Sequence, residues 1–406
     1  ERWGLERAVG RFVGMFAFGL WDSQRRVLHL VRDRLGIKPL FVGRVGDGLV
    51  FGSDVASFTA LPGFVRALDR DVLHGYFRFS CVPSTQCIYE GVEKVPPGFI
   101  LSFDAPNGAP RRTQFWSAAE VAETGAANRS TVGVDEATDL VEEALRVAVR
   151  DRQIADVPLG VFLSGGVDSS VVAALAKASD GKTRTFSIGF HEGAYDEATH
   201  AAAVAKHLGT DHTTLYLTPT EAMDAIPRLA GIYSEPFADS SQLPTLLVCE
   251  MARRDVTVVL SGDGGDEVFG GYNRHLWGPR VWRLASSTPS FARRRLAQML
   301  RTRSPKDWDV LLERAGRFVP PLRARTPGDK VHKLASLVET SSVDDLYDRL
   351  TSIWWSPSDV VRGGHEKHVV RPGLAAGVAE QFMLRDLVGY LHDDVLTKVD
   401  RASMSV

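Results

Sequence analysis

The chain has 406 residues, with 48 Lys and Arg against 50 Asp and Glu, a formal net charge of −2 and 44% hydrophobic residues. This length excludes a single small binding module and allows two or three domains, and the composition excludes a disordered or fibrous protein. Because the charge is close to zero, it attracts neither nucleic acid nor an anionic membrane, and we expect neither as a partner.

Three features bear on where the protein works. No apolar run approaches the roughly 18 residues that a membrane helix needs. The three cysteines, Cys81, Cys87 and Cys249, are too few for a disulfide framework and lack the spacing of a metal site. This favours a reducing compartment and predicts a cytoplasmic protein. The chain starts at Glu1 rather than at a methionine and ends on an uncapped amphipathic stretch, so we expect it to be cut at both ends.

Short apolar runs separated by turn residues fill the N-terminal region. Runs at 13–21 and 27–31, and a third at 49–51 after Gly-Asp-Gly, are typical of antiparallel hairpins. We also expect a short helix at 69–77 and a strand at 99–103. A stretch rich in Ala, Pro, Asn, Gly and Ser follows, and we place a connector at 116–133, after a first domain of residues 1–115.

From residue 134 onward, helices alternate with strands. Apolar residues recur on one helical face over 134–150. Four strands are expected, at 159–163, 184–190, 213–217 and 256–260. This alternation predicts βαβ units on a parallel sheet in a second domain, residues 134–406.

After Tyr272 we expect mostly helices. Residues 280–333 carry fourteen Lys or Arg against four acids, which indicates a solvated helical face, with an RNA-binding patch as the alternative.

The sequence LSGGVDSS at 163–170 follows a predicted strand and opens a predicted helix. Its two glycines let the backbone approach a ligand, and the N–H groups of the turn and the helix start form an anion site, so phosphate is the expected occupant. No lysine follows, and the three-glycine spacing of a dinucleotide site is absent. Phosphate would repel Asp168 unless a divalent cation lay between them, so we predict a Mg²⁺ ligand; the alternative is that Asp168 complements the helix dipole.

A second cluster of glycines and acids, SGDGGDE at 261–267, follows a later predicted strand. Its carboxylates, Asp263, Asp266 and Glu267, repel one another, so a cation or a cationic substrate is needed to hold them. Ligands of an open α/β sheet bind at this edge. Taken alone, the segment could also be a plain turn.

Together the two loops resemble those of the ATP pyrophosphatases with an SGGxDS loop, and among them the glutamine-hydrolysing asparagine synthetases. The likeness extends to DVPLG at 156–160, EPFADSS at 235–241 and KVDRASM at 398–404. In the first domain, GMFAF at 14–18 and RDRLGIKPL at 32–40 resemble the later half of that family's glutaminase domain. The resemblance implies an α+β partial glutaminase sandwich of antiparallel sheets, then an α/β parallel-sheet ATP pyrophosphatase domain with a helical C-terminal part.

The implied reaction uses ATP and Mg²⁺. Aspartate attacks ATP to give β-aspartyl-AMP and pyrophosphate, and ammonia from glutamine then displaces AMP to yield asparagine. A homodimer is a further expectation. By position, Ser164, Gly165, Gly166 and Ser169 would hold pyrophosphate, and Leu163, Ile188, Ser261 and Gly262 would contact the nucleotide. Asp168 and Asp266 match Mg²⁺ ligands, and Asp263 matches the catalytic acid, where some members have Glu.

Several positions depart from the family. Its glutaminase uses an N-terminal cysteine, where this chain has Glu1, and we expect the three cysteines to be core or loop thiols rather than replacements. The later lysine that serves the transition state is absent, and we expect Lys398 to have a structural or substrate-side role. For Arg32, Asp33 and Arg34 we favour a structural ion pair, and the alternative is that they reach toward the synthetase domain across the interface that would carry ammonia.

Two other functions stay open. One is a related amide-forming ligase or amidotransferase that acts on another carboxylate. The other is an inactive nucleotide-binding or assembly protein. The sequence alone does not identify the acceptor carboxylate.

Overall fold

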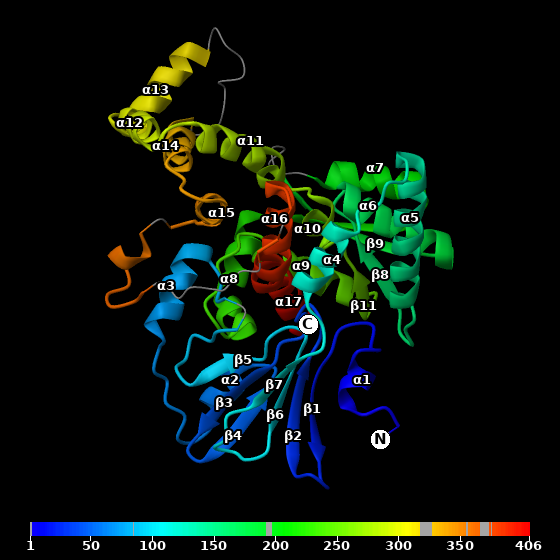
Figure 1. Ribbon diagram of the computed structural model, residues 1–406. Coiled ribbons are helices and arrows are strands. Elements are labelled where there is room, and N and C mark those ends of the chain that lie inside the picture. Colours follow the sequence, from blue (N-terminus) through cyan, green and yellow to red (C-terminus); the bar gives the residue numbers. More distant parts are fainter. Residues whose placement is uncertain are drawn as a thin grey trace.

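The computed structural model describes residues 2–83, 85–191, 197–316, 327–354, 356–365, 373–374 and 376–406. A β-rich part comes first in the chain, and a larger α/β part with a helical extension follows it (Figure 1). The predicted fold class, antiparallel sheets followed by a parallel-sheet domain, is confirmed.

Two antiparallel sheets form the β-rich part, with strand orders β1-β2-β6-β7 and β4-β3-β5. The strands are β1 Ala17–Asp22, β2 Val27–Arg32, β3 Phe41–Val45, β4 Gly48–Gly52, β5 Val92–Lys94, β6 Phe99–Phe103 and β7 Arg111–Gln114. Buried residues from both sheets, among them Leu30 of β2 and Val42 of β3, belong to one core cluster, so the sheets pack face to face. The helices of this part are α1 Leu5–Val9, α2 Val55–Thr59 and α3 Arg70–Phe79.

The hairpins expected from the apolar runs are present. β1 pairs with β2 and β3 pairs with β4, both antiparallel. Gly46 turns the second hairpin with φ +57°, a backbone conformation that glycine adopts without strain. The helix expected at 69–77 is α3, and the strand expected at 99–103 is β6.

A parallel four-stranded sheet with order β10-β9-β8-β11 forms the centre of the α/β part. Its strands are β8 Leu159–Phe162, β9 Arg184–Phe190, β10 Asp211–Leu217 and β11 Val258–Leu260. Its helices are α5 Val134–Arg152, α6 Val167–Asp180, α7 Ala198–Leu208, α8 Pro219–Tyr233, α9 Gln242–Arg253 and α10 Gly265–Phe269. Residues of α5, α6 and α7 share one core cluster with β8, and α9 packs with β9 in another, so helices cover both faces.

The chain after Tyr272 is mostly helical, as expected. Its elements are α11 Asn273–Ser287, α12 Ser290–Arg301, α13 Pro305–Gly316, α14 Pro327–Val338, α15 Val343–Thr351, a 3-10 turn η2 Pro357–Asp359, α16 Val378–Arg385, a π-helical segment η3 Asp386–Leu396 and α17 Thr397–Met404. No helix among the described residues is long and apolar enough to cross a membrane. Residues 317–326 of the basic stretch lie outside the described residues.

One helix, two strands and one π-helical segment differ from the sequence expectations. The predicted connector 116–133 contains a helix, α4 Ala118–Ala127, whose first turn is capped by the Ser117 hydroxyl accepting the N–H of Glu120 at 3.3 Å. Strands β5 and β7 were not predicted, because β5 has three residues and β7 has polar or charged side chains throughout, so neither shows an apolar alternation. The π-helical winding of η3 has no signature in the sequence.

Buried polar contacts join the β-rich part to the α/β part. Lys38 pairs with Asp400 at 2.7 Å, and Lys94 pairs with Glu235 at 2.8 Å. Glu235 also accepts the backbone N–H of Ile88 at 2.8 Å. Because these pairs are shielded from solvent, they fix one relative position of the two parts.

We predict that Glu235→Gln destabilises the protein by about 3 kcal/mol, because the Lys94 ammonium, only 12% exposed, loses its carboxylate partner. Urea denaturation followed by circular dichroism measures the change in free energy of unfolding. Glu93→Gln is the matched control: Glu93 pairs with Arg112 on the exposed surface, and its loss should cost less than about 1 kcal/mol. Equal effects of the two substitutions would contradict the prediction.

Candidate active site

The first loop starts where β8 ends. Leu163 is buried and donates its N–H to the carbonyl oxygen of Phe186 at 2.8 Å, which fixes the end of β8 against β9. Gly165 has φ +80°, and a Cβ there would lie 2.7 Å from the backbone nitrogen of Ala201 in α7. Only glycine therefore fits this turn. Gly166 is the N-cap of α6, whose first N–H groups have no side-chain cap, so they are available to an anion.

Serine hydroxyls hold the shape of this loop. The buried Ser169 Oγ accepts the N–H of Ser164 at 3.1 Å and lies 2.9 Å from Ser164 Oγ. Ser164 Oγ accepts the N–H of Gly166 at 3.2 Å, and Ser170 Oγ donates to the carbonyl of Gly166 at 2.6 Å. These hydrogen bonds within the loop hold its shape, which lowers the entropy cost of binding a ligand.

The second loop lies directly against the first, as expected for strands that end at one sheet edge. β11 pairs in parallel with β8, with Leu260 opposite Val161. A Cβ on Gly262 would lie 2.8 Å from the backbone nitrogen of Ser169, and one on Gly265 would lie 2.5 Å from Cγ of Asp168. The two loops can touch only because both positions are glycine.

The contact brings two carboxylates together. Burial, and after it the charge of Asp266, raises the pKa of the half-buried Asp168 carboxyl above its ordinary value. In the described part of the chain, no three His, Cys, Asp or Glu side chains gather to hold a metal by themselves. Two carboxylates suit Mg²⁺, which is bound in proteins by one or two carboxylates together with phosphate oxygens and water. The residues therefore fit a cation that arrives with a phosphate.

The remaining predicted residues lie at the same edge of the sheet. Ile188 is in β9, two residues past Phe186, which pairs with Phe162 of β8. Ser261 directly follows β11 and is half-buried, and Asp263 is exposed on the second loop. The structure thus brings Leu163 to Ser169, Ile188 and Ser261 to Asp266 to one edge, and it shows no contact of Asp263 with another predicted residue.

A buried polar cluster behind the second loop was missed from the sequence. Asp386, fully buried in η3, accepts from Arg274 Nε at 2.7 Å and from the Tyr347 hydroxyl at 2.6 Å, and lies 2.5 Å from His275 Nε2. The Arg274 guanidinium lies over the rings of Tyr272 and Tyr390, 3.9 and 4.9 Å from their centroids. The partners of Asp386 are 39 to 112 residues away in sequence, so no local sequence pattern predicts them.

Tyr272 links this cluster to the second loop. Its hydroxyl donates to Glu267 at 2.7 Å, and burial raises the pKa of both the Tyr272 phenol and the Glu267 carboxyl. Glu267 is 2% exposed. Of the three acids in the second loop, Glu267 therefore faces the protein interior, where it braces the loop.

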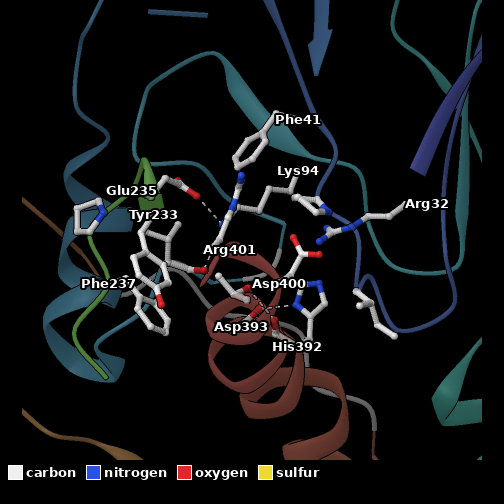
Figure 2. A pocket seen from close by; sticks show the side chains of 15 residues that line it. Arg32, Phe41, Lys94, Tyr233, Glu235, Phe237, His392, Asp393, Asp400 and Arg401 are labelled. Atoms are coloured by element: carbon white, nitrogen blue, oxygen red, sulfur yellow. Dashed lines mark hydrogen bonds and ion pairs between the residues drawn. The ribbon is translucent and has the colours of Figure 1, made fainter. Parts of the chain in front are cut away.

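A narrow cavity of about 30 Å³ lies where the β-rich and α/β parts meet (Figure 2). Charged side chains from both parts line it, among them Arg32, Lys94, Glu235 and Asp400. Burial lowers the pKa of Arg32 to about 10 and also lowers the pKa of His392. This cavity thus places several charged groups beside apolar side chains such as Phe41 and Phe237.

The RDR segment differs from the expected ion pair. Arg32 donates to three backbone carbonyls, those of Gly36, Lys38 and Val95, at 2.8 to 2.9 Å. The Asp33 carboxylate accepts four backbone N–H groups, those of Phe16, Leu35, Ile37 and Lys38. Both side chains therefore hold the loop after β2 through the backbone, and their role is structural.

The contacts of Lys398 and the burial of the cysteines indicate structural roles. Lys398 Nζ donates to Asp239 at 2.9 Å and to Ser241 at 2.7 Å, which connects α17 to the EPFADSS segment. All three cysteines are buried and free, and burial raises the pKa of Cys87 and Cys249 to about 12. Such thiols are poor nucleophiles, which confirms their prediction as core or loop thiols.

Two family models match the chain: asparagine synthase over residues 140–406, and the glutamine amidotransferase domain over residues 1–116. A protein of Methanocaldococcus jannaschii, provisionally named asparagine synthetase (glutamine-hydrolysing) 2, is 37% identical over 277 residues, 67% of this chain and 52% of that protein. Asparagine synthetase (glutamine-hydrolysing) 1 of Bacillus subtilis is 33% identical over 268 residues, 66% of this chain and 41% of that protein.

A third relative, the amidase chry2 of Gibberella zeae, is 32% identical over 284 residues, 65% of this chain and 41% of that protein. The chain spans about half the length of these relatives or less.

We predict that Asp266→Asn lowers the pKa of Asp168, though not to its ordinary value, because burial remains. A raised carboxyl pKa means that ionised Asp168 costs folding stability as pH rises through that pKa, and the variant should lose less stability over this range than the wild type. A carboxyl-carbon NMR titration measures the pKa.

Asp263→Asn is the control for this titration. It removes one charge from the same loop, but Asp263 does not contribute to the shift at Asp168. If both substitutions lowered the pKa equally, the facing of Asp168 and Asp266 would not be its cause.

Proposed function

The chain belongs to the asparagine synthase family, and from this premise we propose that the protein containing it converts aspartate to asparagine with ATP and ammonia. The observation that carries the proposal is the contact of the two glycine loops, which sets Asp168 against Gly265 at the carboxyl edge of the parallel sheet. Because the chain covers only part of its relatives, the complete reaction is proposed for the full-length protein.

ATP would bind across the two loops. The N–H groups at the start of α6, with Gly165, Gly166 and the hydroxyls of Ser164 and Ser169, would receive the β- and γ-phosphates. Leu163, Ile188, Ser261 and Gly262 would line the nucleoside. Because each serine hydroxyl already has a partner within the loop, phosphate would exchange for that partner rather than order a flexible segment.

In the first step, a β-carboxylate oxygen of aspartate forms a bond to the α-phosphorus of ATP, and the bond from that phosphorus to the bridging oxygen breaks to release pyrophosphate. Asp168 and Asp266 would hold Mg²⁺, which neutralises charge on the phosphates when bound. The first loop would stabilise the leaving pyrophosphate through its N–H groups.

In the second step, ammonia attacks the acyl carbon of β-aspartyl-AMP, and the bond to the phosphate oxygen breaks to release AMP. The nitrogen must lose a proton as asparagine forms. Asp263, exposed on the second loop, is the proposed residue that orients ammonia or takes this proton.

Glutamine is the proposed source of ammonia, because residues 1–116 match the glutamine amidotransferase domain. The buried thiols of this chain do not supply the nucleophile for glutamine hydrolysis. Ammonium supplied directly would bypass the hydrolysis of glutamine, so the two activities can be tested separately.

A cytoplasmic location and a homodimer stay predictions. Three free thiols suit a reducing compartment. Fractionation of cells and sedimentation of the purified protein would test the location and the oligomeric state.

We predict that the full-length protein, supplied with ATP, Mg²⁺ and ammonium, forms AMP and pyrophosphate only when aspartate is present. Chromatography of the nucleotides and a coupled pyrophosphate assay measure the products. ADP and phosphate as products would contradict the proposal. Activity with another carboxylic acid but not with aspartate would instead identify a related ligase, and ATP binding without acid-dependent turnover would identify an inactive nucleotide-binding protein.

We also predict that Asp168→Ala lowers pyrophosphate formation by at least about 100-fold while the fold stays intact, because the carboxylate would serve a cation rather than packing. Initial rates over a range of Mg²⁺ concentrations and circular dichroism measure the two effects. Asp151→Ala, at an exposed position of α5, is the matched control and should keep the wild-type rate. Unaltered turnover in Asp168→Ala would refute the assignment.

A further inference from the structure

The apolar face predicted for α5 is covered only near the end of the helix. Val149, in the last turn, is the one buried residue of α5. Leu140 and Val141, which lie earlier in the helix, are 59% and 42% exposed, and Ala144 on the same face is exposed too. An amphipathic helix of a globular protein normally buries this face. The first half of α5 is therefore an apolar surface that no described residue covers.

Acidic side chains surround this surface. Residues 134–144 include five Asp or Glu and no Lys or Arg. Glu136, Leu140 and Glu143 are spaced at i, i+4 and i+7, so they follow one another along one side of the helix. Arg146 pairs with two of the five acids at exposed positions, where ion pairs contribute little. The first half of α5 thus combines exposed apolar side chains with negative charge.

The outward side of α11 has the opposite charge. The inward side packs on the rest of the helical extension, with His275, Gly278 and Ala285 buried. The outward side consists of five exposed residues, Leu276, Trp277, Arg280, Arg283 and Leu284. The Trp277 side chain is 57% exposed. Arg280 places its guanidinium over the Trp277 ring, 4.7 Å from the centroid, so apolar surface and positive charge lie together.

The basic charge of this region is balanced only in part. Residues 273–301, which contain α11 and α12, include seven Arg and no Asp or Glu. Arg274 and Arg301 have acidic partners elsewhere in the helical extension, whereas Arg280 and Arg283 form no ion pair with a described residue. The net charge of −2 for the whole chain therefore hides an acidic and a basic surface, which attract charges of opposite sign.

The two surfaces do not meet within one chain. Figure 1 shows α5 along the outer edge of the α/β part, whereas α11 leads away from it toward α12 in the helical extension. An RNA or an anionic membrane would match the arginines of α11, but it would be repelled by α5 and would leave the apolar face of α5 exposed. A second copy of the chain matches both surfaces at once.

We propose that the first half of α5 in one copy packs against the outward side of α11 in a second copy. In this contact Leu140 meets the Trp277 ring, and the acids beside Leu140 face Arg280 and Arg283. Two such contacts related by a two-fold axis close a dimer, whereas one contact repeated builds a longer assembly. Each surface is one helix wide, less than the roughly 800 Å² per partner of a standard interface, so we expect a micromolar dissociation constant. The inference is independent of the proposed reaction.

The test measures association of the full-length protein by sedimentation velocity over a range of concentrations. One variant carries Glu136→Lys and Glu143→Lys, and the other carries Arg280→Glu and Arg283→Glu. Each variant alone should have a dissociation constant at least about tenfold higher than that of the wild type, because like charges then face each other. An equimolar mixture of the two variants should associate again, since each reversed surface meets its complement.

Control variants separate this contact from a general effect of charge. Glu90→Lys with Glu123→Lys, and Arg25→Glu with Lys206→Glu, make equal changes of charge at exposed positions of other segments and should associate like the wild type. Trp277→Ala should weaken association at unchanged charge, because a Trp at the centre of an interface contributes much of the binding energy. Circular dichroism checks that every variant is folded.

The association should also weaken as salt rises from about 0.05 to about 0.5 M, because salt screens exposed charges. A wild type that does not associate, or a mixture that stays dissociated like its two components, would overturn the inference. Association of equal strength in the wild type and both variants would overturn it as well. If the wild type does not associate but binds RNA or phosphatidylserine vesicles through Arg280 and Arg283, the inference is equally wrong, and that ligand is the partner of α11.

Discussion

The site depends on the close approach of its two loops at the edge of the parallel sheet, which brings the like charges of Asp168 and Asp266 near enough to raise the pKa of Asp168 beyond the effect of burial. The parallel pairing of β8 with β11 delivers both loops to one place, and Gly262 and Gly265 remove the side chains that would hold them apart. Repulsion between like charges must be opposed by the surrounding structure or by a cation. The surrounding structure does so from behind, where Glu267 faces inward and bonds to Tyr272.

Buried polar groups extend this support of the second loop away from the sheet. The Asp386 carboxylate contacts Arg274, His275 and the Tyr347 hydroxyl, so α11, α15 and η3 meet at one side chain. Removing one partner of a buried charge costs more folding stability than the intact contact contributes. Such a contact therefore selects one arrangement of the chain more than it raises stability. The same logic applies where the two parts of the chain meet, at Lys38 with Asp400 and Lys94 with Glu235.

The sequence predicted those features that depend on patterns within a short stretch of the chain. The hairpins, the parallel strands and both glycine loops follow from spacing and turn residues, and the family assigned from them is confirmed. Strand β7 was missed because its polar and charged side chains show no apolar alternation. The prediction of an ion pair in the RDR segment was wrong, because Arg32 donates to backbone carbonyls instead. Burial and the charge of Asp239, 155 positions earlier in the chain, raise the pKa of Asp394, and no local window of sequence contains both acids. The roles of the individual site residues stay predictions.

The continuous helix that runs from α16 through η3 into α17 constrains how this region can evolve. Tyr390 and Asp394 line a cavity beside α11 and α15, while Lys398 and Asp400 further along bind partners in two other segments. Inserting or deleting one residue in a helix rotates everything beyond it by about 100°. A length change within η3 would therefore turn Asp400 away from Lys38 and uncouple the two parts of the chain. Relatives should vary in length before α16, whereas insertions within this helix should be selected against.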